Sequence, residues 1–88
     1  MIWKIEFDSE VEKDLRKLGA TAQKRILTFL KKRIATTNDP RMHGKALTGD
    51  FSGLWRYRVG DYRIISKLED NIFTVLVVKV GHRKDIYD

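Results

Sequence analysis

Apolar and polar residues alternate at the start of the chain and then change to a helical spacing. Within residues 2–7, Trp3, Ile5 and Phe7 are separated from one another by single charged residues. Side chains of a strand point alternately to its two faces. The pattern therefore predicts a half-buried strand with these three residues turned inward.

Two helices are expected after this strand. Ser9 followed by Glu12 is a capping-box pattern and Gly19 is a typical helix stop, so a short helix is predicted over about residues 9–18. Apolar residues then recur every three or four positions. These residues are Ala22, Ile26, Phe29, Leu30 and Ile34. They predict a second helix over about residues 21–35, which forms an antiparallel hairpin with the first.

The second half of the chain predicts a loop and three strands. Residues 40–53 contain one proline and three glycines and are expected to form an extended loop that leads into the sheet. Strands are predicted at 54–59, 62–68 and 72–80, and the last is rich in β-branched residues, as a central strand is. Residues 1–88 are therefore expected to form one α+β domain of order βααβββ, with the helix hairpin packed on a mainly antiparallel four-stranded sheet.

The turn between the first two of these strands fixes their pairing. Gly60 and Asp61 form a two-residue loop with glycine first, which favours a type II′ turn. In this register Arg58 lies opposite Arg63. One face carries Trp55, Tyr57, Val59, Tyr62 and Ile64, and the other carries Arg56, Arg58, Arg63 and Lys67. We expect the aromatic face to be the core under the helices.

The charge of the chain gives the basic face a functional interpretation. The net charge is +6, which indicates either a polyanionic partner or simple solubility. Like charges directly opposite each other destabilise a sheet, and a phosphate held between two guanidinium groups relieves that repulsion. We therefore predict that Arg56, Arg58 and Arg63 bind nucleic-acid phosphate. The alternative is a solvated strand face whose arginines pair with nearby aspartates.

The residues after the last strand carry further candidate chemistry. His82, Arg83 and Tyr87 supply groups for proton transfer, charge stabilisation and base stacking, and Lys84 adds a positive charge. The alternative for His82 is a surface residue without a catalytic role. The alternative for Tyr87 is a structural role in which its ring packs against the sheet.

Other site classes find no support in the sequence. The chain has no cysteine, and His43 and His82 with scattered carboxylates make no metal motif, so we expect neither a metal nor a cofactor. No apolar stretch approaches the roughly 18 residues of a membrane span. The N-terminus lacks the pattern of a signal peptide. A cytoplasmic protein with no membrane contact is expected.

Four segments resemble motifs of the RelE/ParE toxin superfamily in order and spacing. They are Phe7–Asp8 through Lys17–Leu18–Gly19, Lys45–Ala46–Leu47–Thr48–Gly49, Gly60–Asp61–Tyr62–Arg63–Ile64 and Val80–Gly81–His82–Arg83–Lys84–Asp85–Ile86–Tyr87. Each segment is short, but together they cover essentially the whole chain. Within this superfamily the chain resembles the RelE-like toxins, which cleave messenger RNA in the ribosomal A site without a metal.

The resemblance implies a reaction and roles for the basic residues. A ribose 2′-OH attacks the adjacent phosphate, which Arg58 and Arg63 hold, with Arg56 at a second basic position of the same strand. Arg83 is expected near the leaving 5′ oxygen and Tyr87 on a base. Lys45, Lys67 and Lys84 are expected to contact RNA.

The chain departs from RelE at the positions of Arg56 and Arg58, where RelE is expected to have lysines. Arginine effectively cannot lose its proton, so neither residue suits a general base. We therefore predict that His82 or Tyr87 serves in proton transfer.

The resemblance also implies partners and alternatives. The expected partners are a cognate RelB-like antitoxin, messenger RNA, and the 70S ribosome with its rRNA. Residues 15–38 contain basic residues and no acids, which suits an acidic antitoxin segment and rRNA equally well. The alternative functions are a ParE-like inhibitor of DNA gyrase and a catalytically inactive nucleic-acid-binding toxin homologue. The pair Arg83 and Tyr87 favours the ribonuclease.

Overall fold

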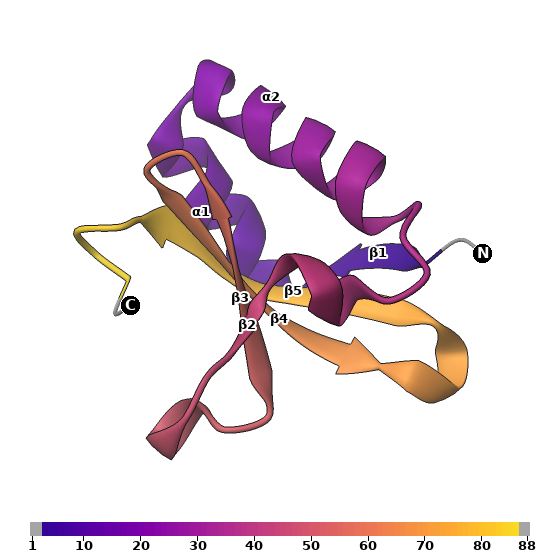
Figure 1. The fold of residues 1–88 in the computed structure, drawn as a ribbon. Helices are drawn as coiled ribbons and strands as arrows, with labels where there is room; N and C mark the ends of the chain where they lie inside the picture. The colour runs from indigo at the N-terminus through magenta and orange to yellow at the C-terminus, as the bar shows by residue number, and fades with distance from the viewer. Residues whose placement is uncertain (1–2, 87–88) are drawn as a thin grey trace.

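The computed structural model describes residues 3–86, so Tyr87, a predicted site residue, lies outside the described residues. The first half holds β1 (Lys4–Phe7), α1 (Ser9–Leu18), α2 (Ala20–Phe29) and a π-helical turn (Leu30–Ile34). The second half holds β2 (Lys45–Ala46), β3 (Leu54–Val59), β4 (Tyr62–Glu69) and β5 (Thr74–His82). Short 3₁₀ turns lie at Pro40–His43, Gly49–Phe51 and Asp70–Ile72. Figure 1 shows the arrangement of these elements.

The sheet has the strand order β1-β5-β4-β3-β2. β1 runs parallel to β5, and the other neighbours are antiparallel. The α+β class and the central place of β5 confirm the sequence analysis. The predicted number of four strands is wrong, because the loop before β3 contains the short edge strand β2. This strand pairs Lys45 with Arg56 and Ala46 with Trp55.

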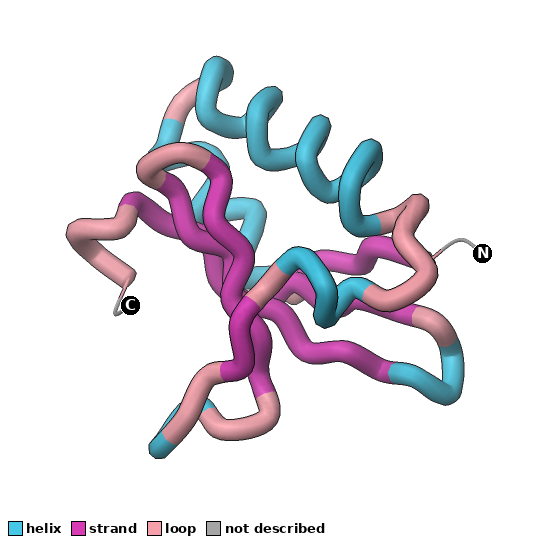
Figure 2. Tube along the Cα trace, in the orientation of Figure 1, coloured by secondary structure: helices cyan, strands magenta, loops and turns pink. Residues whose placement is uncertain are grey.

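The helices α1 and α2 lie on the same side of the sheet, as Figures 1 and 2 show. The core between them and the sheet consists of Trp3, Val11, Ile26, Leu30, Ile34, Tyr57, Ile64, Val75, Val77 and Val80. As the alternation predicts, Trp3, Ile5 and Phe7 share one side and line a hollow together with Leu27 of α2. Phe7 is nevertheless 41% exposed, and β1 is an edge strand of the sheet.

Local sequence signals explain the ends of the helices. α1 begins at the predicted residue, but its N-cap is Asp8 rather than Ser9, and the Asp8 carboxylate accepts a hydrogen bond from the Glu10 backbone N–H at 3.1 Å. Gly19, with φ of 89°, separates α1 from α2. The second helix ends in a π turn, in which the Ala35 N–H donates to the Leu30 carbonyl at 2.8 Å.

The pairing of β3 with β4 has the predicted register. Arg58 lies opposite Arg63, and Gly60 has φ of 58°, as the first position of a type II′ turn requires. Tyr57 and Ile64 belong to the core, so Arg58 and Arg63 face the other way. We call the side of the sheet that faces away from α1 and α2 the outer face.

Candidate nucleic-acid interface

The opposed arginines on the outer face differ in their surroundings. Arg58 is exposed, whereas Arg63 is 5% exposed. One nitrogen of the Arg63 guanidinium, Nη1, donates to the carbonyls of Gly60 and Tyr62, each at 3.0 Å. These two hydrogen bonds stabilise the β3–β4 hairpin loop. They also fix the direction of the Arg63 guanidinium.

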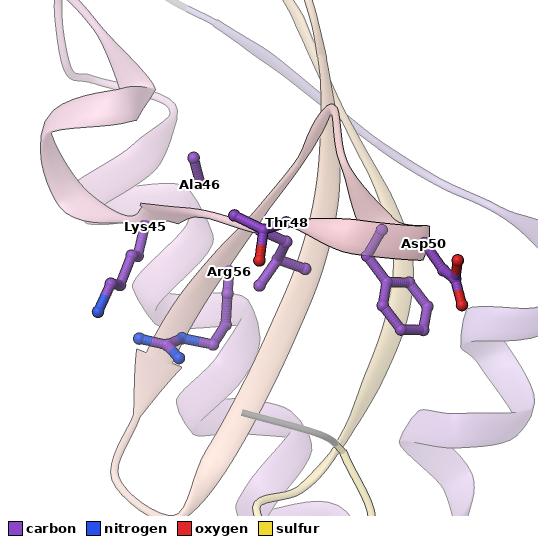
Figure 3. Close-up of a pocket in the computed structure, with 7 residues that line it drawn as sticks. Lys45, Ala46, Thr48, Asp50 and Arg56 are labelled. Carbon is purple, nitrogen blue, oxygen red and sulfur yellow. The ribbon is translucent and has the colours of Figure 1, made fainter.

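Lys45 and Arg56 form a second cationic pair beside the first. They are register partners on β2 and β3, and Arg56 is 7% exposed. Figure 3 shows their side chains extending to the same side of a hollow, whereas Asp50 lies at the opposite end. The hollow has a volume of about 560 Å³ and is also lined by Thr48. The predicted sites Lys45 and Arg56 are thus brought together.

Arg83 is tied to the hairpin turn that carries the arginine pair. Its backbone N–H donates to the Asp61 carbonyl at 2.7 Å, and its Nε lies 3.8 Å from the Asp61 carboxylate. This exposed ion pair adds little stability, but the backbone bond fixes where the tail leaves the sheet. The structure therefore brings Arg58, Arg63 and Arg83 to the same end of the molecule.

The His82 side chain lies on the other face of the sheet from Arg58 and Arg63. Its register partner is Tyr62, and the two rings pack edge to face with centroids 5.8 Å apart. This pair is on the side of the sheet that carries the helices, opposite Arg63. The ring atom Nδ1 accepts a hydrogen bond from the Lys84 backbone N–H at 3.2 Å. The neutral ring therefore carries its proton on Nε2.

The end of the described chain returns to the outer face. The Ile86 N–H donates to the His82 carbonyl at 3.1 Å, which closes a tight turn. Ile86 is buried, and a Cβ added at Gly81 would lie 2.8 Å from its side chain. Gly81 is the register partner of Arg63. A larger residue at this position would therefore have to push the Ile86 side chain aside.

Lys67 and Lys79 lie at different positions on the outer face relative to the arginines. The predicted site Lys67 is opposite Leu54, four residues along β4 from Arg63, which is about 13 Å. Lys67 is two residues from Ile65, the register partner of Arg56, so it lies diagonally across from Arg56 but away from the Arg58–Arg63 pair. Lys79, which the sequence analysis missed, is exposed and is the register partner of Ile65, whose partner on β3 is Arg56. The sequence signal for this position is the spacing of Val77 and Val80. Both are core residues although they are three positions apart in one strand, which indicates an inserted residue between them.

A network of polar contacts fastens the loop that leads into β2. Arg41 Nη2 lies 2.6 Å from the Asp70 carboxylate in the β4–β5 connection, and its Nη1 lies 3.3 Å from Asp39. The Arg41 hydrogen bond lowers the pKa of the Asp70 carboxyl below its ordinary value. The guanidinium also lies 5.9 Å from the Trp55 ring centroid. We call Asp39, Arg41 and Asp70 the loop latch.

Tyr57 supports the same loop from below. Its hydroxyl donates to the Pro40 carbonyl at 3.0 Å, and burial raises the pKa of this phenol. Gly44 packs so closely on the ring that an added Cβ would lie 2.7 Å from Tyr57 Cε1. Together with the loop latch, these contacts determine where Lys45 stands beside Arg56.

Within residues 3–86, no three histidine or acidic side chains gather where they could share a metal ion. No helix among these residues is both long enough and apolar enough to span a membrane. The chemistry available on the outer face is therefore that of cations: it can bind phosphate oxygens and stabilise negative charge that develops on them.

Comparison with known proteins finds the same architecture in a group of toxins. Residues 5–87 match a sequence model of the family described as the ParE toxin of the type II toxin–antitoxin system parDE. The toxin RelG of Mycobacterium tuberculosis is 29% identical over 87 residues, which are 99% of this chain and 98% of that protein. The toxin RelE3 of Methanocaldococcus jannaschii is 33% identical over 87 residues, covering 97% and 96%. The M. tuberculosis toxin–antitoxin complex RelBE2 superposes with a TM-score of 0.86 and 25% identity, covering 94% of this chain and all of the matched one.

Proposed function

Since this chain belongs to the ParE toxin family of type II toxin–antitoxin systems, we propose that it is a RelE-like endoribonuclease that cleaves messenger RNA in the ribosomal A site and so inhibits translation. The observation that carries the proposal is the meeting of Arg58, Arg63 and Arg83 at one end of an outer face that the helices leave uncovered. The curated relatives named RelG and RelE3 support the same choice.

The proposed reaction is transesterification within the RNA strand. The ribose 2′-OH attacks the adjacent phosphorus, the bond from phosphorus to the 5′ oxygen breaks, and the products carry a 2′,3′-cyclic phosphate and a 5′-OH. Arg58 and Arg63 bind the phosphate oxygens, on which negative charge grows in the transition state. Arg83 stabilises the leaving oxygen. Arg56 and Lys45 bind the RNA strand alongside.

Proton transfer is assigned to His82 or Tyr87. Lys84 donates its backbone N–H to Nδ1 of His82, so Nε2 is the nitrogen through which His82 would act. To accept the 2′-OH proton at Nε2, the ring must adopt the tautomer protonated at Nδ1 and give up the Lys84 hydrogen bond. That cost, together with the position of His82 across the sheet from Arg63, favours Tyr87 of the two.

A cognate antitoxin is the proposed regulatory partner, because the superposable M. tuberculosis protein is in a toxin–antitoxin complex. A hollow is lined by Lys24 and Arg25 of α2, by Lys32 and Arg33 of the π-helical turn that follows it, and by the apolar side chains of Phe29 and Val59. An acidic amphipathic segment of an antitoxin complements such a surface, and rRNA complements its charge. The proposed place of action is the cytoplasm, on the 70S ribosome.

The proposal is tested by incubating the protein with programmed ribosomes and mapping the 5′ ends of the cut messenger. We expect cuts at A-site codons with 2′,3′-cyclic phosphate ends. Arg58→Ala should slow single-turnover cleavage by about 10²–10³-fold, as for removal of one preorganised donor. Lys13→Ala, a charge removal on the exposed side of α1, is the control. Intact messenger with wild-type protein would overturn the proposal.

The match to the ParE family supports one alternative, inhibition of DNA gyrase. A supercoiling assay with purified gyrase separates the two functions. Loss of supercoiling together with uncut messenger on programmed ribosomes would establish the gyrase inhibitor. If supercoiling is unaffected and the messenger stays uncut while RNA is still bound, the protein is a toxin homologue without catalysis.

A further inference from the structure

We propose that Lys79 is a further RNA-phosphate-binding residue of the outer face, an inference that rests on the proposed ribonuclease function. Lys79 lies on β5, two strands away from Arg56, with Ile65 of β4 between them. Lys45 of β2 continues the same line on the other side of Arg56. Residues in register across a sheet form a row, so cations on β2, β3 and β5 lie in one row across the outer face.

A β-bulge places Lys79 in this row. Val77 pairs with Ser66 and Lys79 pairs with Ile65, which leaves Val78 as the extra residue. Val77 and Val80 are both buried in the core. Strict alternation between them would turn Lys79 inward, whereas the bulge turns both intervening residues to the outer face.

A long-range contact holds the strand in register after the bulge. Asp14 of α1 accepts a hydrogen bond from the Val80 backbone N–H at 3.2 Å. β1 pairs with β5 only as far as Val77, so the carboxylate supplies an acceptor where no strand partner remains. The bulge and this contact together fix the direction of Lys79.

The surroundings of Lys79 suit an anionic ligand. Its side chain is exposed, so no burial of charge opposes its place. It borders an apolar hollow of about 360 Å³ with Leu54, Ile65 and Val78. A lysine stem packs well along such a surface while the ammonium stays available to a phosphate as a point charge. Asp85 is the acid that lines both hollows bordered by Lys79.

The spacing of the cations in this row also suits binding of an extended single strand of RNA. Lys79 and Arg56 are separated by two strand spacings, about 10 Å between Cα atoms. Cations at that separation repel each other little in water, and each can neutralise a different phosphate. An RNA strand crossing the sheet from β5 to β2 would therefore meet Lys79, Arg56 and Lys45 in turn, beside the Arg58–Arg63 pair.

The test is the salt dependence of binding to a short labelled single-stranded RNA. One phosphate contact fewer makes the slope of log K against log salt shallower by about 0.7 for single strands, which corresponds to about fivefold weaker binding at 0.1 M salt. We expect this change for Lys79→Ala and not for Lys79→Arg, which keeps the charge. Asp85→Asn should tighten binding, since it removes an anion near the phosphate.

The control is Lys13→Ala, the same loss of charge on α1. Lys79→Ala should keep the thermal midpoint of the wild type, because the side chain is exposed. A Kd and a salt slope equal to those of Lys13→Ala would refute the role of Lys79. If the wild-type protein cuts messenger on programmed ribosomes and Arg58→Ala slows that cleavage as expected, the proposed function stands without Lys79. If wild-type protein neither binds RNA nor cuts messenger, both proposals are wrong.

Discussion

At the scale of single residues, Arg63 and His82 each have a nitrogen atom that is already hydrogen-bonded within the protein. Arg63 Nη1 is held by the turn carbonyls of Gly60 and Tyr62, which orders the guanidinium before any ligand arrives. His82 is held by Tyr62 on one side and by Lys84 on the other. Preorganised donors stabilise a transition state without reorganising during the reaction, so these contacts bear directly on the proposed chemistry.

Substitution of His82 separates proton transfer from positioning. If His82 transfers a proton, His82→Ala should slow single-turnover cleavage by about 10²–10⁴-fold. His82→Asn keeps an acceptor for the Lys84 N–H but cannot transfer a proton. Activity restored by asparagine assigns a positioning role, and wild-type rates for both variants leave Tyr87 as the proposed group.

Gly44→Ala tests the packing of the loop on Tyr57. The backbone at Gly44, with φ of −136°, is open to alanine, so the cost comes from the close approach of the new methyl group to the Tyr57 ring. We expect the free energy of unfolding to fall by about 1–3 kcal/mol, as overpacking does. Urea denaturation measures the change. A midpoint equal to that of wild type would show that the loop moves away freely.

At the scale of elements, the loop latch connects two segments far apart in the chain. Arg41 and Asp70 are separated by 29 positions, and their contact joins the loop before β2 to the connection between β4 and β5. The Tyr57 hydroxyl adds a second long-range contact to this loop through the Pro40 carbonyl. The place of Lys45 beside Arg56 therefore depends on contacts outside β2 itself.

The loop latch should respond to pH. Arg41 lowers the pKa of Asp70 in the folded state, so the stabilisation is present above the ordinary Asp value of about 3.9 and disappears as pH falls through the lowered value. Asp70→Asn should therefore lower the thermal midpoint at pH 7, and its difference from wild type should shrink as the pH falls below about 3.9. Asp50→Asn, which removes an exposed acid in the neighbouring loop, is the control. A difference that stays constant as the pH falls would contradict the ion pair.

At the scale of the whole molecule, the fold covers one face of its sheet and leaves the other for cations. Both helices lie on the same side of the sheet (Figure 1), and the apolar core fills the space beneath them. The outer face carries charges from β2, β3, β4 and β5 on one rigid support. Sites built on strands keep their geometry better than sites on loops.

Hydrogen exchange should show that this support is stiffest at its centre. As far as Val77, β5 has strand partners on both sides, and Val75 and Val77 are buried, so their amides should exchange only on global unfolding. The amides of the edge strand β2 should exchange faster by local opening. Native-state exchange followed by NMR measures both, and equal protection of β2 and β5 would contradict the expectation.

The sequence by itself determined the features that depend on neighbours along the chain. The Gly60–Asp61 turn fixed the opposition of Arg58 and Arg63, because a two-residue loop admits one register. The spacing of apolar residues fixed the two helices to within a few residues. These signals are short-range, so they can be recognised without knowing what packs against them.

Only the tertiary structure decided the features that depend on distant partners. The outward direction of Lys79 follows from a bulge and from Asp14, which lies 66 positions before Val80. The face occupied by His82 follows from the pairing of β5 with β4, and the strand β2 exists because Arg56 and Trp55 supply its partners. A period-two sequence pattern predicts alternating side chains, but it does not reveal an inserted residue such as Val78. The row of cations that includes Lys79 could therefore be found only in the folded sheet.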